Sequence, residues 1–382
     1  MIQAGVIGVG QTKYDAKRRD VSMGGLVREA IDNAMLAADI EWDAIDAVIL
    51  GKAPDMFEGV VMPELCLADA IGAVGKPVLR VHTAGSVGGS TGVIAATHVC
   101  SGQFKTVLTV TFEKQSESNA TWALSPRYPY SPHINAGAGG YFAPFIREYI
   151  RRYDAPEHIG WKVAVKDRLN ALKNPLAHLH IPGIDEKMVS DTPMLWEPLR
   201  YLESCPSSDG ACAMVITSKD LVGSRDVAWI KGMAVRSEGT LSAGRDEVNP
   251  QAGIDCAKDI YDQAGITNPY KEIDCAEIYV PFSWYEPMWL ENLGFCNLGE
   301  GWKLTDKDAT AIDGEMPFNM SGGVMSSNPI GASGMIRFGE AALQVMGKAN
   351  DHQVEDAKVA MGHAYGGAAQ FFAMWIVSSS LD

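Results

Sequence analysis

The chain has 382 residues and a formal net charge of −15 at pH 7. This length exceeds what one small core needs, and it suits two fused units or one large α/β body. The acidic charge disfavours nucleic acid and anionic membranes as partners, although a local basic patch is still able to bind a nucleotide-bearing thioester. A hydrophobic content of 47% with 21% charged residues is typical of soluble globular proteins.

Seven cysteines are spread along the chain without a CxxC pair, which disfavours a zinc site. The first residues carry no secretory signal, so we expect reduced thiols and a cytoplasmic location. The longest apolar run, Phe371 to Val377, is far shorter than the roughly 20 residues of a membrane-spanning helix. We therefore interpret this run as a buried strand.

Strand and helix signals alternate in the first part of the chain. Apolar residues at helical spacing follow Ser22, which predicts a helix from this cap to about Ala38. Pro63 and the glycine-rich turn at Gly85 mark the starts of two further helices. The expected elements are strands at 4–10, 45–50, 77–82 and 104–112, with helices at 22–38, 63–71 and 85–100.

The regular alternation stops between about residues 113 and 204, where proline, asparagine, tyrosine and histidine are frequent. Helical patches remain near Tyr141–Tyr153 and Trp161–Leu172. We interpret 113–204 as an insertion that lies over one face of the protein. A strand at 210–217 then restores the earlier pattern.

The second part of the chain repeats the order of elements with little residue identity. The expected strands are 227–235, 273–279, 357–362 and 371–378, and the expected helices are 251–263, 285–293 and 331–346. Two halves rich in βαβ units predict two sheets with helices packed between and outside them.

Five segments carry recognisable patterns: Val81–Ser90, Lys173–Ala177, Ser207–Ala213, Asn328–Gly334 and His363–Gly367. They resemble, in that order, the nucleophile segment, the NP-x-A stretch, the SDGAAA strand entry, the GHPxGASG loop and the HN-x-GG turn of the thiolase superfamily. The likeness is to its sterol-carrier-protein-type and lipid-transfer branch. It implies two βαβαβαββ halves, 1–220 and 221–382, in a five-layer α-β-α-β-α sandwich with 113–204 as a loop-domain insertion.

The residues that carry thiolase chemistry differ from that pattern. Gly85 stands where the nucleophilic cysteine is expected, so no acyl-enzyme can form at this position. Asn328 replaces the loop histidine, and Tyr279 replaces the histidine of the HDAF segment. The histidine of the HN-x-GG turn is retained as His363. Since Tyr and Asn still form hydrogen bonds, the changes favour altered chemistry over lost chemistry.

Several candidate catalytic residues follow from these positions, each with a structural alternative. Tyr279 with a lowered pKa can exchange a proton with an alcohol, or it is a packed aromatic residue. His363 is a general acid/base or a structural histidine, and Tyr365 is a weaker candidate beside it. Asn328 is a hydrogen-bond donor for the reacting thioester. Ser86 is either a nucleophile helped by the helix dipole or a first-turn hydroxyl that caps the helix.

The expected substrate pocket contains His82, Gly85, Gly331 and Gly366, with Gly85 making room beside the reacting carbon. No metal is expected. The spacing of His178 and His180 is compatible with a metal, but no third ligand signal accompanies it. Gly8-Val9-Gly10 lacks the third glycine of a dinucleotide fingerprint.

A pocket that stabilises an enolate without a nucleophile can run a retro-aldol cleavage. Members of the resembled branch in actinobacterial steroid side-chain degradation lack the cysteine and act as acyl-CoA aldolases, with tyrosine as acid/base and an OB-fold/zinc-ribbon partner. The resemblance therefore implies a coenzyme A thioester substrate, no bound cofactor, and a homodimer or a heteromer with a thiolase-like homologue or such a partner. An acyltransferase and a non-catalytic acyl-CoA or lipid-carrier subunit stay open as alternatives.

Overall fold

The central feature of the fold is one continuous nine-stranded sheet. The computed structural model describes residues 3–53, 55–119, 124, 137–239 and 244–381. Within them the strand order is β3-β2-β4-β7-β1-β8-β11-β10-β9. The sheet divides at the β1–β8 contact, where only Gly5 and Val6 pair with Trp229 and Ala228. The two parts correspond to the two sheets predicted from the sequence.

The first part of the sheet is built from the N-terminal strands. β2 pairs in parallel with β3 and β4, whereas β7 lies antiparallel between β4 and β1. Strands β1, β2, β4 and β7 are buried along their whole length, as expected for near-continuous apolar runs covered on both faces. The bounds are β1 Ala4–Gln11, β2 Ala47–Lys52, β3 Val78–Val81, β4 Thr106–Lys114 and β7 Asp209–Ser218.

The second part of the sheet comes from the C-terminal half. Its strands are β8 Ala228–Ser237, β9 Cys275–Glu277, β10 Val359–Gly366 and β11 Phe371–Ser378. β10 is parallel to β9 and antiparallel to β11. Beyond these strands, Phe318 forms a single parallel bridge with Ala276 of β9.

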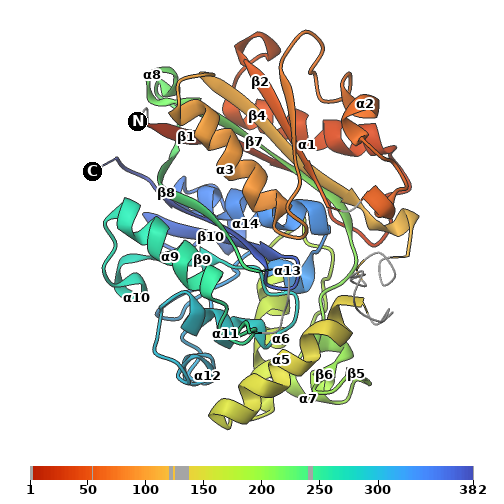
Figure 1. Cartoon of the computed structure of the whole chain (residues 1–382), viewed down its shortest axis with the longest axis vertical. Helices are drawn as coiled ribbons and strands as arrows, with labels where there is room; N and C mark the ends of the chain where they lie inside the picture. The colour runs from red at the N-terminus through yellow and green to blue at the C-terminus, as the bar shows by residue number, and fades with distance from the viewer. Residues whose placement is uncertain (1–2, 54, 120–123, 125–136, 240–243, 382) are drawn as a thin grey trace.

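Helices form layers between and outside the two parts of the sheet (Figure 1). α3 (Val87–Cys100) and α14 (Ile330–Val345) pack on each other in the middle and are buried on nearly all sides. A β-carbon at Gly88 would lie 2.4 Å from the backbone nitrogen of Met335, so glycine permits this close helix contact. α1 (Met23–Ala38) and α9 (Gln251–Ala264) cover the outer faces. The predicted layered α/β fold is confirmed.

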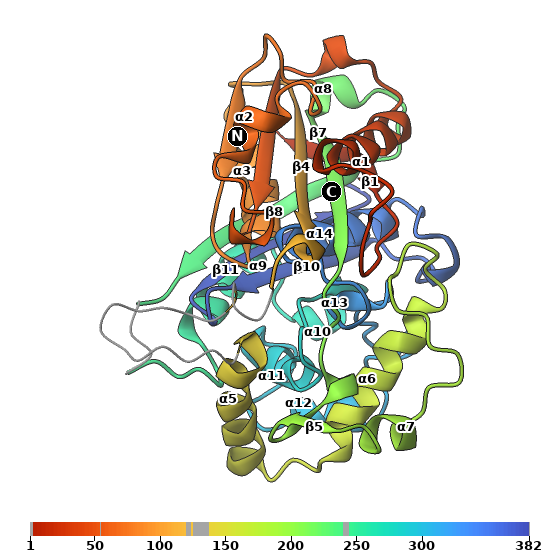
Figure 2. The same ribbon diagram turned by 90° about the vertical axis from the view of Figure 1, so that its right-hand side faces the viewer.

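The insertion packs against the C-terminal half. Figures 1 and 2 show α5 (Gly137–Tyr153), α6 (His158–Ala171) and α7 (Glu186–Ser190) beside α11 (Tyr285–Asn292) and α12 (Gly301–Asp306). Side chains of both segments share one buried hydrophobic cluster. The short strands β5 (Met194–Trp196) and β6 (Leu199–Arg200) form a separate hairpin. Residues 120–123 and 125–136 of the insertion lie outside the described residues.

The remaining helices are short: α2 Pro63–Leu67, α8 Lys219–Val222, α10 Pro269–Glu272 and α13 Gly323–Ser326, with the 3-10 helices Trp42–Ala44, Asp55–Phe57, Gln115–Glu117, Tyr201–Glu203 and Asn350–His352. Across the described part of the chain, no helix combines the length and the apolar character that crossing a bilayer requires.

Two boundaries differ from the sequence-based expectation and affect the site. β10 continues to Gly366, so His363 and Tyr365 lie in a strand and not in a turn. Pairing of His363 with Met374 and of Tyr365 with Phe372 on β11 extends the strand past residue 362. β9 ends at Glu277, which leaves Tyr279 just beyond the strand.

Candidate active site

The candidate site lies where β9, β10 and the start of α14 meet. Tyr279 follows β9, His363 and Tyr365 come from β10, and Asn328 precedes α14. All four are buried, with at most 5% of each residue exposed. The structure therefore brings together four candidates that come from three separate segments of the sequence.

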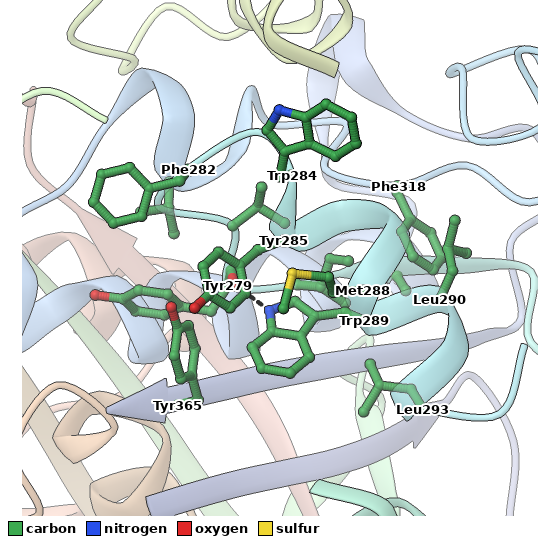
Figure 3. Packing of buried hydrophobic residues seen from close by; sticks show 14 of the residues in the cluster. Tyr279, Phe282, Trp284, Tyr285, Met288, Trp289, Leu290, Leu293, Phe318 and Tyr365 are labelled. Carbon is green, nitrogen blue, oxygen red and sulfur yellow. Dashed lines mark hydrogen bonds between the residues drawn. The ribbon is translucent and has the colours of Figure 1, made fainter. Parts of the chain in front are cut away.

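Tyr279 is fixed on both sides of its backbone. Its N–H donates to Nδ1 of His363 at 3.2 Å, and its carbonyl accepts from Nε1 of Trp289 at 2.9 Å (Figure 3). Its hydroxyl donates to Oδ1 of Asn328 over a long 3.4 Å. Burial raises the pKa of Tyr279 above its ordinary value, so the phenol keeps its proton at neutral pH. The lowered pKa that a base role would require is not found, because desolvation outweighs the lowering effect of Ser333.

His363 is a neutral hydrogen-bond donor in this arrangement. Because Nδ1 accepts the Tyr279 N–H, the ring hydrogen lies on Nε2. Nε2 is buried and has no hydrogen-bond partner among the described residues. Burial lowers the pKa of His363 to about 3. An N–H group that none of these residues binds is suited to a ligand oxygen, and a ring that already holds its proton there is unsuited to act as a base.

The depressed pKa of His363 predicts a contribution to acid sensitivity. An unfolded histidine binds a proton below about pH 6.5, whereas folded His363 stays neutral down to about pH 3. Stability is therefore lost as the pH falls through this window. Between pH 6 and pH 4, His363→Gln should reduce the loss of unfolding free energy by about 2 kcal/mol, measured by urea unfolding. An unchanged pH slope would show that His363 titrates normally in the fold.

Asn328 is held through both its side chain and its backbone. Nδ2 donates to Sγ of Cys205 at 3.1 Å, and Oδ1 accepts from Oγ of Ser333 at 2.7 Å. The backbone N–H donates to Oγ of Ser208 at 3.1 Å, and the backbone carbonyl accepts from the side-chain amide of Gln115. The position and the orientation of Asn328 are thus set by contacts with four other residues.

Gly331, in the first turn of α14, helps to hold the segment that carries Asn328. A β-carbon here would lie 2.5 Å from Oε2 of Glu113, and the Gly331 N–H donates to that oxygen at 3.0 Å. Glu113 also accepts from Nζ of Lys52 at 2.8 Å and from the Ala53 N–H at 3.2 Å. Glu58 contacts Lys52 from the other side at 2.5 Å. A buried carboxylate therefore anchors the first turn of α14, next to Asn328.

Gly85 and Gly366 bring the two halves of the site into backbone contact. A β-carbon on Gly366 would lie 2.3 Å from the nitrogen of Ser86 and 2.4 Å from that of Gly85. A β-carbon on Gly85 would meet only Cα of Gly366 at 3.3 Å and the carbonyl oxygen of Tyr365 at 3.4 Å. Ala84, just before this turn, has a left-handed backbone with φ of 50°.

Ser86 and His82 lie apart from the hydrogen bonds that join Tyr279, His363 and Asn328. Ser86 is buried, and its Oγ donates to the carbonyl of Thr83 at 2.7 Å. Ser86 occupies the N-cap position of α3, but its side chain accepts no hydrogen bond from the helix, and its hydroxyl is already bound to Thr83. His82 is exposed on the turn after β3, and its pKa is lowered by partial desolvation and by Arg80. Within the described residues His82 makes no hydrogen bond to the site.

Tyr365 forms part of an aromatic wall. Its ring meets the Tyr279 ring edge-on with centroids 5.3 Å apart, and it stacks on Tyr285 at 5.6 Å. Figure 3 shows these three tyrosines grouped beside Trp289. Burial and the adjacent Tyr285 and Tyr279 raise the pKa of Tyr365 well above its ordinary value. This phenol is therefore protonated, like that of Tyr279.

Two side chains of the site were not identified as functional from the sequence. Cys205 is one of the dispersed cysteines, and its N–H donates to the Pro281 carbonyl at 2.8 Å, two residues after Tyr279. Ser333 lies within the Asn328–Gly334 motif, but the motif gives no indication that its hydroxyl contacts the Asn328 side chain. Cys205 comes close to Asn328 because of the path that the chain takes from the insertion to β7. No local sequence pattern predicts that path.

The two histidines with metal-like spacing have separate partners. Nδ1 of His178 contacts Oγ of Ser208 at 2.8 Å, and Nε2 of His180 contacts the Asn174 carbonyl at 2.9 Å. Among the described residues, no group of three or more histidine, cysteine or acidic side chains is arranged to hold a metal ion.

Comparison with known sequences gives a consistent set of relatives. A family model described as Thiolase C-terminal domain-like matches residues 234–379. An acetyl-CoA acetyltransferase of Methanothermobacter thermautotrophicus is 29% identical, covering 99% of this chain and 100% of its own length. Human sterol carrier protein 2 is 28% identical, covering 94% of this chain and 69% of its own length.

Solved structures extend the likeness to the whole fold. The Ltp2–ChsH2(DUF35) aldolase superposes with a TM-score of 0.85 at 25% identity, covering 100% of this chain and 98% of that one. Human mitochondrial 3-ketoacyl-CoA thiolase in complex with CoA has a TM-score of 0.73 at 17% identity, covering 99% of this chain and 98% of its own. The second match shows the fold alone, and both confirm the predicted architecture.

Proposed function

Because the chain belongs to the thiolase superfamily, in its sterol-carrier-protein-type branch, we propose that it cleaves a β-hydroxyacyl-CoA by a retro-aldol reaction. The observation that carries the proposal is the pairing of Tyr279 and His363 beside a position 85 without a side chain. The site retains hydrogen-bonding groups for a thioester and lacks a nucleophile where the family has one. A steroid or other lipid side chain is the acyl group that the resemblance favours.

A protonated Tyr279 is compatible with this reaction when it relays a proton. The β-hydroxyl passes its proton to the phenol oxygen, and the electron pair of that O–H bond forms the new carbonyl. The Cα–Cβ bond breaks, and its electron pair becomes the thioester enolate. The phenol gives its own proton to the α-carbon, which yields an aldehyde or ketone and a shortened acyl-CoA. The relay needs no net base, and it suits a tyrosine whose pKa is raised by burial.

The enolate oxygen needs hydrogen-bond donors that are present before the reaction. The Nε2–H group of His363 is a buried donor without a partner among the described residues. Its neutral state favours a developing anion less strongly than an imidazolium would, but it is available at every physiological pH. We assign His363 this role, and Asn328 the role of orienting the Tyr279 hydroxyl.

Acyl transfer is the second candidate, because the Cys205 thiol lies in the site. Burial raises the pKa of this thiol to about 11, which leaves little thiolate at neutral pH. Its one described side-chain contact is with Nδ2 of Asn328, a donor that cannot take the proton. The geometry therefore supports the aldolase over a Cys205 acyltransferase. Ser86, whose hydroxyl is bound by Thr83, is a poorer nucleophile still.

One experiment separates the three functions. The protein is incubated with a β-hydroxyacyl-CoA bearing a steroid side chain, and products and intact protein mass are measured together. An aldolase releases a carbonyl compound and a shorter acyl-CoA without any mass change. An acyl adduct on Cys205 or Ser86 would establish the transferase instead, whereas binding without products, alone and with partner, would establish a carrier subunit.

The assay should be run both with and without a partner protein. The Ltp2 aldolase of the solved structure is in complex with a ChsH2(DUF35) protein. We propose that this chain likewise works as a dimer with a partner of that kind. Activity that appears only on addition of a DUF35 protein encoded beside this chain would support the assembly.

A further inference from the structure

Cys205 lies at the junction between the insertion and β7, outside the reaction described above. Its backbone is tied to Pro281, so the thiol is held close to the segment that carries Tyr279. The side chain is only partly exposed, and burial raises its pKa to about 11. A protonated thiol with no acceptor base is a weak nucleophile, but its sulfur still accepts a hydrogen bond.

The contact between Cys205 and Asn328 determines which end of the amide faces Tyr279. Nδ2 donates to the sulfur at 3.1 Å, which leaves Oδ1 on the side of Ser333 and Tyr279. If the amide turned around, two N–H groups would face the phenol, and its hydroxyl would lose its acceptor. Both Asn328 and Ser333 are buried, so water does not compensate for a lost contact.

We propose that Cys205 is a positioning residue that fixes the Asn328 amide, so that its carbonyl oxygen orients the Tyr279 hydroxyl. Tyr279 is also bound through its backbone N–H to His363, whose Nε2 is buried and lacks a hydrogen-bond partner among the described residues. The inference rests on the proposed function for its effect on turnover. The contact itself is testable without any reaction.

The direct test uses alkylation of Cys205 by iodoacetamide, resolved by peptide mass mapping between pH 7 and 10, below the pKa of the thiol. The Asn328 N–H stabilises the thiolate, since this bond lowers the pKa of the thiol. In Asn328→Ala the alkylation rate of Cys205 at each pH should fall by about three- to tenfold, because losing one ordinary hydrogen bond raises the pKa by about half to one unit and reduces the thiolate fraction accordingly. Exposed Cys66 supplies the internal control and should keep its rate. An unchanged rate at Cys205 would overturn the contact.

The functional test compares Cys205→Ala with Cys205→Ser in the complete assembly. Alanine removes the acceptor, and we expect kcat to fall roughly five- to tenfold with KM little changed. Serine keeps an oxygen that accepts from Nδ2 and should restore most of the rate. Equal rates for wild type and Cys205→Ala would reject the positioning role. If the wild-type protein shows no cleavage but Asn328→Ala slows the alkylation of Cys205, then the proposed reaction is rejected and the contact between Cys205 and Asn328 is supported.

Discussion

Replacement of Tyr279 by phenylalanine is expected to lower kcat for retro-aldol cleavage by roughly 10²–10⁴-fold. The substitution removes only the hydroxyl that relays the proton. KM should change little, because the ring still fills its place against Tyr365. The measurement is steady-state release of the carbonyl product from a β-hydroxyacyl-CoA.

The fold should tolerate this change, so a lower kcat would not be explained by unfolding of the protein. The one described hydrogen bond of the hydroxyl is long, at 3.4 Å, and the backbone contacts of Tyr279 remain. Tyr201→Phe is the matched control, since Tyr201 is 61% exposed and lies outside the site. Near-wild-type turnover in Tyr279→Phe would end the proposed mechanism. Equal losses in both variants would point to a general effect on the protein.

Replacement of Glu113 by alanine is expected to cost about 3–5 kcal/mol of unfolding free energy, because each buried hydrogen-bond donor left without an acceptor costs about 1–3 kcal/mol. The change leaves Lys52 with one carboxylate contact and removes the acceptor of two backbone N–H groups, at Ala53 and Gly331. Lys52 and Glu113 are both fully buried, so water cannot replace the missing oxygens. Urea unfolding followed by circular dichroism measures the loss.

The control for Glu113 is an exposed ion pair. Lys187 and Asp191 lie one helical turn apart with side chains 78% and 63% exposed. Asp191→Ala should cost under about 1 kcal/mol, as surface pairs do. A comparably small effect of Glu113→Ala would mean that the first turn of α14 does not depend on this carboxylate. In folded Glu113→Ala protein the turnover should also fall, because Glu113 holds the first turn of α14, which directly follows Asn328.

Local sequence signals were sufficient where a single element decides its own structure. The Ser22 cap and the helical spacing after it place α1 correctly, because Ser22 accepts the Gly25 N–H at 3.1 Å. The buried run at Phe371 is strand β11, as expected from its length. The end of β10 was missed, because its pairing with β11 extends a strand through glycine and alanine that carry weak strand propensity.

The chemistry of the site depends on contacts between distant segments. The motifs identified Tyr279, Asn328 and His363, but their protonation follows from burial that no local pattern reveals. The acid/base alternative for Tyr279 assumed a lowered pKa, whereas desolvation raises the pKa of this phenol. Cys205 was missed for a related reason, since it reaches Asn328 across 123 positions of the chain.

The unequal surroundings of Gly85 and Gly366 make position 85 the more permissive of the two. Packing forbids a β-carbon at 366, whereas at 85 a shift of a few tenths of an ångström would accommodate one. Position 366 is therefore fixed as glycine by the main chain of the opposite segment. Position 85 is instead the point at which an engineered side chain could enter this part of the protein with little disturbance of the backbone.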